Sequence, residues 1–322
     1  MEGMKRKLAL TSALLSIAIL STACQSEAQS ASAPQLPSTY QLTADATGST
    51  FEGIGVDDKR GVFYVSEVSG GEIHRGTSGV AKTEEWLKGD GTDGRTTARG
   101  ITVDSEGRIY IAGGPNGIGN DKPDLWVYSP EGTLLAALRA PGNQVFLNDV
   151  AIGPDGAAYF TNSNDPQIFR IALDGSAWKA TLWADAKGQI ERKEGFNLGG
   201  IVLSADRSAF VVAQGNTGML WRFDTKTGAA TAVRGGTGLN NADGLILQGD
   251  TLTVVRNFDH LLATLRLTAD GSAVEKVREE RTDPKRVFTT AKPLRGQTLF
   301  VDSNFKEEPP TGPFEVVTDP TV

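Results

Sequence analysis

The sequence is poor in the side chains that form disulfides or bind soft metals. Cysteine occurs once, at Cys24, and histidine occurs twice, at His74 and His260. A lone thiol cannot form an internal disulfide, and so few thiols and imidazoles make a poor zinc site. The sequence also lacks the Gly-x-Ser-x-Gly and His-Glu-x-x-His motifs. No short sequence motif therefore indicates a serine hydrolase or a zinc protease.

An excess of positive charge is absent too. The chain has 32 Lys and Arg residues against 39 Asp and Glu residues, so its net charge is −7. Binding to a nucleic-acid backbone depends on a basic surface that neutralises phosphates. This charge balance therefore argues against a nucleic-acid partner.

The N-terminal hydrophobic run, Leu8 to Leu20, is shorter than the roughly 20 residues that span a lipid bilayer. Lys5, Arg6 and Lys7 precede it and Ser21-Thr22-Ala23-Cys24 follows, which is the layout of an export signal. We therefore predict a lipoprotein-type signal peptide over residues 1–24, cut before Cys24 and acylated there. The protein is then an exported cell-envelope lipoprotein that meets the membrane only through this lipid. A plain signal cut nearby, giving a secreted or periplasmic protein, is the alternative.

Two further segments follow the signal. Residues 25–38 are rich in Ser, Ala, Gln and Pro and have almost no charge, which predicts a flexible linker. Residues 39–322 show no convincing helical periodicity and have a size that a single β domain can reach. We expect this domain to be a monomer.

Within that domain one hairpin pattern occurs six times. In residues 148–163 a polar pair precedes an apolar run, a Gly-Pro-Asp-Gly turn and an aromatic strand. We call the residue at the start of each copy its gate residue. The gate residues are Glu52, Arg99, Asn148, Gly199, Asp243 and Thr289, at intervals of 44 to 51 residues. That interval suits the four strands of a propeller blade, so we predict an all-β, six-bladed β-propeller with four-stranded blades around a central channel.

The predicted propeller brings the gate residues together, because one strand of each blade lines the channel. Glu52, Asn148 and Asp243 would then offer oxygen ligands at one channel mouth, and Asn197 lies two residues before its gate. Ca²⁺ binds about 6 to 8 oxygens from carboxylates, amides and water. The ring therefore predicts a site for Ca²⁺ or another divalent cation.

The gates Glu52, Asn148 and Asp243, each followed by Gly or Asp and an apolar strand, carry a resemblance to a known family. They resemble the senescence-marker-protein, gluconolactonase and luciferin-regenerating-enzyme family, and residues 212–222 resemble its secreted bacterial branch. The resemblance implies a cation held by a Glu, two Asn and an Asp. Three of these map to Glu52, Asn148 and Asp243, but the second Asn falls on Gly199. Asn197 is the nearest amide, about 6 to 7 Å away along a strand, so it would need a bulge to ligate.

The resemblance also shapes the predicted chemistry. Sugar-lactone hydrolases of the family have an arginine where this chain has Phe146, which favours a more apolar lactone or ester as the small-molecule substrate. Arg99 could present its guanidinium to the channel or pair with a neighbouring carboxylate. His260 could line the channel or support a proton transfer, and the alternative is that it has no functional role. We predict a hydrolase in which Asp243 or Asp149 acts as base or nucleophile.

The main alternative is a protein without catalytic activity. Propellers also serve as rigid binding platforms, and a fold alone does not decide function. The substitution by Gly199 favours this alternative, whereas an intact Glu52, Asn148 and Asp243 set favours catalysis.

Overall fold

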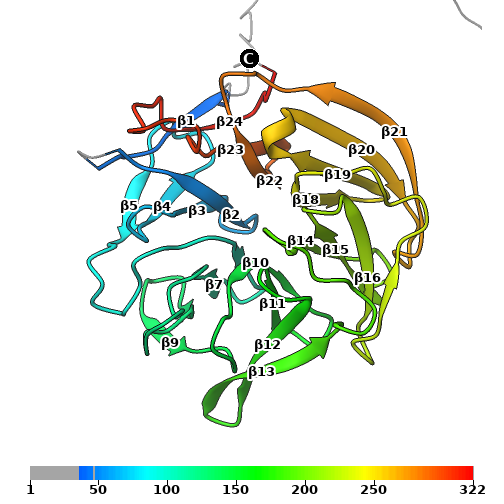
Figure 1. The fold of residues 1–322 in the computed structure, drawn as a ribbon. Helices are drawn as coiled ribbons and strands as arrows, with labels where there is room; N and C mark the ends of the chain where they lie inside the picture. Colours follow the sequence, from blue (N-terminus) through cyan, green and yellow to red (C-terminus); the bar gives the residue numbers. More distant parts are fainter. Residues whose placement is uncertain (1–35, 46–47, 322) are drawn as a thin grey trace, which may run out of the picture. The chain divides into compact units, whose positions relative to one another are not determined.

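The protein is described here from a computed structural model, which covers residues 36–45 and 48–321. The predictions for the signal peptide, for acylation at Cys24 and for most of the linker lie outside the described residues. The described chain forms six four-stranded antiparallel sheets around a channel (Figure 1). The predicted all-β, six-bladed propeller is therefore confirmed. The one helical element of the described residues is a short 3₁₀ turn, η1 (Asn257–Asp259).

Five blades are each built from four consecutive strands, with the first strand innermost. Blade 1 contains β2 (Phe51–Asp57), β3 (Val62–Glu67), β4 (Ile73–Thr77) and β5 (Glu84–Leu87). Blade 2 contains β6 (Ile101–Val103), β7 (Ile109–Ala112), β8 (Leu125–Tyr128) and β9 (Leu134–Leu138). Blade 3 contains β10 (Leu147–Ile152), β11 (Ala158–Asn162), β12 (Gln167–Asp174) and β13 (Ala177–Asp185). Blade 4 contains β14 (Leu198–Leu203), β15 (Ala209–Gln214), β16 (Met219–Asp224) and β17 (Ala230–Ala232). Blade 5 contains β18 (Ala242–Gln248), β19 (Thr251–Arg256), β20 (Leu261–Leu267) and β21 (Val274–Arg281).

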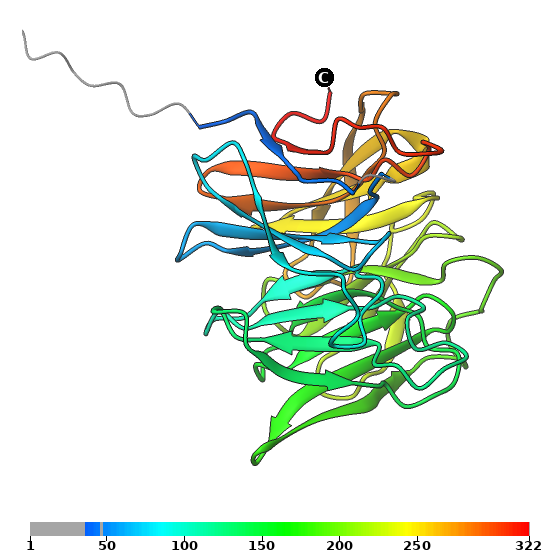
Figure 2. The same cartoon turned by 90° about the vertical axis from the view of Figure 1, so that its left-hand side faces the viewer.

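Blade 6 is completed by a strand from the other end of the domain. It contains β22 (Phe288–Leu294), β23 (Gln297–Asp302) and β24 (Glu315–Val317), and its outermost strand is β1 (Thr39–Gln41). The blue β1 lies beside the red end of the chain in the side view (Figure 2). Tyr40 is fully buried there and pairs with Val316 across the two strands. This pairing joins the first and last strands and closes the ring of blades.

The blades pack through hydrophobic faces that the sequence pattern supplies. Alternating residues of β11 and β12, such as Phe160 and Phe169, are fully buried and form one core with Leu125 and Val127 of blade 2. Short turns connect consecutive strands of a blade. In the turn between β10 and β11, Gly156 has a φ of +78°. Glycine adopts this backbone conformation without steric cost, which is why the Gly-Pro-Asp-Gly segment forms that turn.

A β-bulge interrupts the innermost strand at the gate position in five blades. The pairing shifts register between Phe51 and Ile54, Leu147 and Val150, Leu198 and Ile201, Ala242 and Leu245, and Phe288 and Ala291. A bulge places two consecutive residues opposite one and changes the direction of their side chains. As a result, the gate residue and the residue after it both line the channel.

Candidate functional site

The channel is lined by three successive tiers of residues, one from each blade. The gate tier consists of the six gate residues defined above. The neck tier follows directly after the gates and consists of Gly53, Gly100, Asp149, Gly200, Gly244 and Thr290. The lower tier lies two residues further along each inner strand, because side chains alternate there. It consists of Gly55, Thr102, Ala151, Val202, Ile246 and Lys292.

The neck tier is narrow because the inner strands approach one another closely. A Cβ atom on Gly200 would lie 2.2 Å from the carbonyl oxygen of Asp243, and one on Gly53 would lie 2.3 Å from that of Arg99. The space left in the neck is about 10 Å³, roughly the room for one water molecule. The neck therefore divides the channel into an upper cavity of about 680 Å³ and a lower hollow of about 280 Å³.

The upper cavity brings together side chains from four blades. Glu52, Arg99, Asn148 and Asp243 all line it, although nearly 200 residues separate the first from the last in sequence. Glu52 and Asn148 are buried, and Asp243 is half-buried. The floor of this cavity therefore carries two carboxylates, one amide and one guanidinium.

Arg99 forms an ion pair with Glu52 at the cavity floor. Its Nη1 donates to Glu52 Oε2, and its guanidinium lies 4.9 Å from the centre of the Phe146 ring. Burial raises the pKa of Glu52, and the neighbouring Arg99 charge opposes this effect. Arg99 therefore lines the upper cavity and also forms the ion pair with the neighbouring gate carboxylate.

Asp243 is the most perturbed acid of the cavity. Burial raises its pKa well above the ordinary value, and the nearby charge of Glu52 adds to the rise. Asn257 Nδ2 donates to Asp243 Oδ2 over 2.8 Å and holds the carboxyl group in place. Sequence analysis missed Asn257, and the only signal was its position directly after β19, the strand that pairs with β18 beside Asp243.

Asp149 lies in the neck tier and does not line the upper cavity. Its Oδ1 accepts the Val150 N–H over 2.8 Å, and its Oδ2 accepts the Ile201 N–H over 3.1 Å. Burial raises the pKa of Asp149, while the Lys292 charge lowers it. Because backbone amides occupy both oxygens, the geometry favours Asp243 over Asp149 as the base.

Asn197 borders the upper cavity, but its side chain braces a loop. Its Nδ2 donates to the carbonyl oxygens of Lys193 and Ser163, at 3.0 and 3.2 Å, and its Oδ1 accepts the Lys193 N–H at 2.9 Å. The bulge in β14 follows Asn197 and leaves these bonds in place. At Gly199, where the family has the second Asn, a Cβ would lie 3.8 Å from Asn148 Oδ1. The cavity floor is therefore open on this side.

His260 lies outside the lining of the upper cavity. Its Nδ1 donates to the Arg286 carbonyl oxygen over 2.9 Å, and its Nε2 accepts from Lys306 Nζ over 2.6 Å. The neighbouring residues Asn257 and Phe258 reach the cavity instead. The geometry therefore favours a supporting position for His260 at the 3₁₀ turn over a place in the channel.

Aromatic side chains form the upper walls of the cavity. Phe196 and Phe258 line it and remain 55% and 46% exposed, respectively. Phe196 meets the Phe146 ring edge-on at 5.4 Å between centroids, and Phe305 also lines the cavity. Sequence analysis predicted an apolar contact only at Phe146, because loop residues give no periodic signal. The cavity thus has a polar floor beneath an aromatic rim.

The donor set at the floor suits a hard cation. Asn148 has no hydrogen-bond partner for its side chain within the described residues, and one carboxylate oxygen each of Glu52 and Asp243 has no protein donor there. Carboxylate and amide oxygens are the ligands that Ca²⁺ prefers. A divalent cation would also offset the surplus of carboxylates around the single guanidinium.

A second acidic group joins the segment between β1 and β2 to blade 1. Carboxylate oxygens of Asp45, Glu67 and Glu72 lie within 4.8 Å of one another. The two oxygens of Glu67 already accept from Ser69 Oγ at 2.7 Å and meet His74 Nε2 at 3.0 Å. These contacts give Glu67 and His74 a structural role within blade 1.

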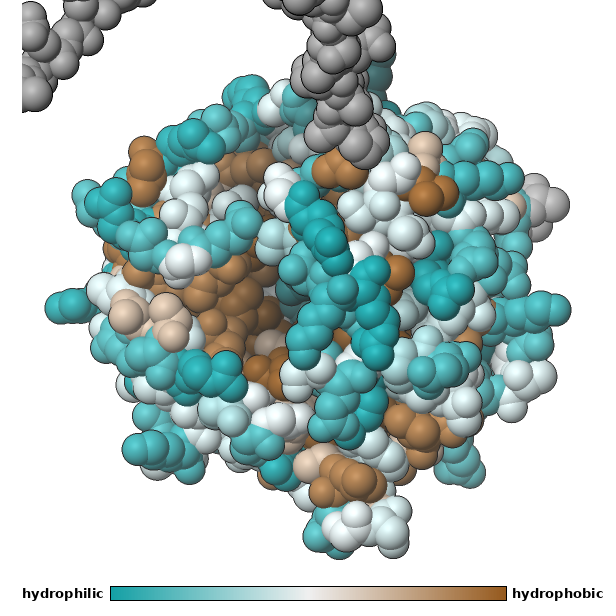
Figure 3. All heavy atoms as spheres, turned by 180° about the vertical axis from the view of Figure 1, so that it is seen from behind, coloured by the Kyte–Doolittle hydropathy of each residue, from teal (hydrophilic) through white to brown (hydrophobic). Residues whose placement is uncertain are grey.

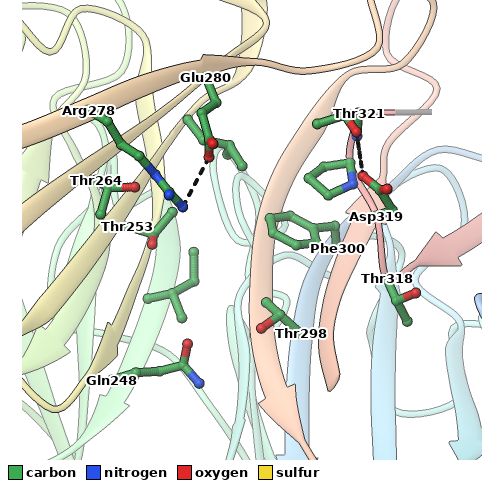
Figure 4. A pocket seen from close by; sticks show the side chains of 13 residues that line it. Gln248, Thr253, Thr264, Arg278, Glu280, Thr298, Phe300, Thr318, Asp319 and Thr321 are labelled. Carbon is green, nitrogen blue, oxygen red and sulfur yellow. Dashed lines mark hydrogen bonds and ion pairs between the residues drawn. The ribbon is translucent and has the colours of Figure 1, made fainter. Parts of the chain in front are cut away.

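A further cavity of about 330 Å³ lies between blades 5 and 6 (Figure 4). Its charged groups have partners: Arg278 forms an ion pair with Glu280 at 3.2 Å, and Asp319 accepts a hydrogen bond from the Thr321 hydroxyl over 2.6 Å. Thr253, Thr264 and Thr298 line the rest among apolar side chains (Figure 4). No set of acids and bases converges in this cavity, so the upper cavity is the stronger candidate site.

Comparison with known proteins supports the architecture. No family model matches the sequence, and no curated protein matches it. Among solved structures, the Malassezia sympodialis allergen Mala s 1 aligns with a TM-score of 0.65 at 13% identity, over 88% of this chain and 96% of that one. A catalytically inactive virginiamycin B lyase from Staphylococcus aureus, with quinupristin, aligns with a TM-score of 0.61 at 17% identity, over 83% and 82%. The calcium-binding protein regucalcin from Agrobacterium tumefaciens aligns with a TM-score of 0.59 at 15% identity, over 84% and 91%.

At these identities the likeness concerns the fold. The fold shared with regucalcin agrees with the six-bladed propeller predicted from the sequence. The similarity to the lyase and the allergen is equally strong, so no single branch is distinguished. As for membranes, none of the described residues belongs to a helix with the length and hydrophobicity needed to cross a bilayer.

Proposed function

We propose that the protein is a hydrolase of small apolar lactones or esters that depends on Ca²⁺ or another divalent cation and acts in the upper cavity. The observation that carries this proposal is a set of hard oxygen donors with surplus negative charge beneath an aromatic rim. The likeness to regucalcin, which is described as calcium-binding, is in keeping with it.

Charge in the channel supports the cation. Glu52, Asp149 and Asp243 all have raised pKa values, chiefly because they are buried. Such a cluster is costly unless positive charge balances it. A bound divalent cation would polarise the carbonyl oxygen of the substrate and stabilise the negative charge that develops there.

The residues of the chain supply the other parts of the reaction. Asn257 fixes one oxygen of Asp243, which leaves the other free to take a proton from a water molecule. The water oxygen then bonds to the carbonyl carbon, the carbon–oxygen bond to the alcohol breaks, and the departing alkoxide regains the proton.

The rim determines which substrates fit. Phe196 and Phe258 can bury an apolar acyl or ring group and exclude water from the reacting carbonyl. Their position opposite the polar floor places the ester group between the two environments. Polar sugar lactones are therefore expected to be poor substrates.

The decisive experiment combines calcium titration with a panel of lactones and aryl esters. Saturating calcium is expected to raise the melting temperature by on the order of 5 °C. Asp243→Asn is expected to remove most of that shift and to lower turnover by about 100-fold or more. The matched control is Asp174→Asn, because Asp174 pairs with Lys179 on an exposed hairpin of blade 3. Turnover that survives unchanged in Asp243→Asn, at full calcium, would eliminate this mechanism.

The second candidate is a binding platform without catalysis. Gly199 provides no ligand, and Arg99 already occupies one oxygen of Glu52, and both features weaken a cation site. A platform is expected to show neither a calcium-dependent shift nor turnover. Equilibrium dialysis with ⁴⁵Ca²⁺ separates the two candidates independently of any substrate.

We also propose that the chain is exported and acylated at Cys24, which places the propeller at the cell envelope as a monomer. The support is the order of charged, apolar and small residues ahead of the single cysteine. Incorporation of labelled palmitate is expected in the intact chain and not in Cys24→Ser. Labelling that persists in Cys24→Ser would contradict the lipid anchor.

A further inference from the structure

We infer that the lower hollow is a second ligand site, separate from the upper cavity, that binds a small anionic amphiphile such as a medium-chain carboxylate. This site does not depend on the proposed hydrolase activity. It opens on the opposite face of the propeller, where Figure 3 shows a hollow with hydrophobic walls.

Ten of the twelve residues that line the lower hollow have apolar side chains, and the other two are Thr102 and Lys292. Five inner strands contribute these residues, and the main apolar contacts would be with Val103, Ile152, Val202, Leu203, Ile246 and Leu247. Ligand pockets commonly measure about 300 to 1,000 Å³, and the volume of about 280 Å³ lies just below that range. The hollow therefore suits a short hydrocarbon chain or a single ring.

One charged side chain, Lys292, lines this hollow. It lies within β22, between the well-paired residues Ala291 and Pro293, so its backbone position is fixed. Within the described residues its ammonium group has neither a hydrogen-bond acceptor nor an ion-pair partner. An ammonium group carries three donors, and among apolar walls an anion would satisfy them.

The neck residue Asp149 does not take the place of that anion. The Lys292 charge lowers the pKa of Asp149, but no ion pair joins the two side chains. Both Asp149 oxygens instead accept backbone N–H groups, from Val150 and Ile201. Lys292 therefore keeps donors for a ligand that enters from the lower face.

The neck also isolates the two sites. Its space of about 10 Å³ admits about one water molecule, so an organic ligand cannot pass between them. The charge of each compartment selects a different ligand: surplus carboxylates in the upper cavity attract cations, and Lys292 in the lower hollow attracts an anion. The apolar walls beside Lys292 then favour an amphiphile over a small inorganic anion.

The test uses calorimetric titration of the purified full chain with octanoate and, as the opposite charge on the same hydrocarbon, octylammonium. We expect octanoate to bind and octylammonium to bind at least tenfold more weakly. Lys292→Met is expected to weaken octanoate binding at least tenfold, whereas Lys292→Arg retains it. Ala151→Leu fills the lower tier without touching the charge and is expected to reduce binding as well.

Asp243→Asn locates the binding site, because Asp243 lines the upper cavity and the neck but not the lower hollow. Octanoate binding that is unchanged in this variant supports the lower hollow, and binding lost in it overturns the assignment. Equal affinity for octanoate and octylammonium, or full affinity in a folded Lys292→Met variant, also overturns it. If Lys292→Met fails to fold, Ala151→Leu decides: unchanged octanoate affinity in that variant overturns the proposal.

Discussion

Arg99 sets the charge of the gate tier. Its ion pair with Glu52 neutralises one of the two carboxylates at the cavity floor and holds that side chain against the channel wall. The same guanidinium lies over the ring of the buried Phe146, which contacts Phe196 of the aromatic rim. Arg99 would therefore compete with the proposed divalent cation for the same carboxylate.

The first prediction follows from that competition. In Arg99→Met the floor loses its positive charge while the apolar packing of the side-chain stem is largely kept, so calcium is expected to bind several-fold more tightly. Without calcium the variant should melt at a lower temperature, because Glu52 is left buried and unpaired. Isothermal titration with calcium measures the affinity, and Arg99→Lys serves as the charge-preserving control. Weaker calcium binding in Arg99→Met would show that Arg99 supports the cation rather than competing with it.

Asp124 makes stability depend on pH away from the site. Burial raises its pKa to about 6, although it accepts the Ala140 N–H at 2.8 Å. The folded chain therefore holds this proton more tightly than the unfolded chain, whose aspartates titrate near pH 3.9. Its stabilising contribution is complete below about pH 4 and is lost as the pH rises through about 6.

The second prediction replaces this acid by its neutral isostere. Asp124→Asn can still accept the Ala140 N–H but does not ionise. Between pH 5 and pH 7 the native chain is expected to lose on the order of 1 kcal/mol of unfolding free energy relative to the variant. Denaturant titrations at both pH values measure this difference, with the exposed Asp121→Asn as control. An identical pH dependence in Asp124→Asn and the native chain would contradict the raised pKa.

Much of the site could not be read from single residues in the sequence. The gates Glu52, Asn148 and Asp243 were found because each begins a repeated pattern. Asn257 and Phe258 lie outside that pattern, in a turn whose path depends on the neighbouring blades. Asn197 was predicted as a ligand because its side chain is an amide. In the structure that amide forms hydrogen bonds with the backbone of Lys193 instead.

At the scale of the strand, the bulge and the glycine after it act together. The bulge turns two consecutive residues toward the axis, and the neighbouring inner strand then leaves no room for a second side chain. Glycine suits the neck tier because it has no Cβ atom to clash with the neighbouring strand. Alternation and turn residues predict a strand from sequence, whereas a bulge depends on the partner strand. The hairpins and the gate tier could therefore be predicted, but the neck and lower tiers could not.

The third prediction concerns this close approach. Gly200→Ala places a Cβ 2.2 Å from the Asp243 carbonyl oxygen, so the inner strands of blades 4 and 5 must separate. We expect a loss of roughly 1 to 3 kcal/mol of unfolding free energy and a weaker calcium response. Gly188→Ala is the matched control, because its Cβ would meet nothing within 4 Å. Equal denaturation midpoints for the two variants would contradict the tight neck.

At the scale of the whole molecule, the ring is closed by a strand from outside the repeat. β1 pairs with β24, and Tyr40 and Leu42 are buried in the core shared by blades 6 and 1. The sequence predicted the number of blades from the hairpin copies. It did not predict this closure, because a three-residue strand carries too little pattern to be recognised.

The fourth prediction tests the closure by truncation. Removing residues 1–35 keeps β1 and is expected to leave the melting temperature unchanged. Removing residues 1–43 deletes β1 and the buried Tyr40 and Leu42 side chains, which is expected to cost on the order of 4 kcal/mol or more. Differential scanning calorimetry of the two forms provides the comparison. Equal melting temperatures would show that the ring holds together without the N-terminal strand.

The narrow neck gives the propeller the form of two back-to-back cups rather than a tube. Substitutions that reshape one cup leave the floor of the other untouched, since glycine backbones and the amide-bound Asp149 form the partition between them. A chain built in this way can acquire a new specificity on one face while selection preserves the chemistry of the opposite face.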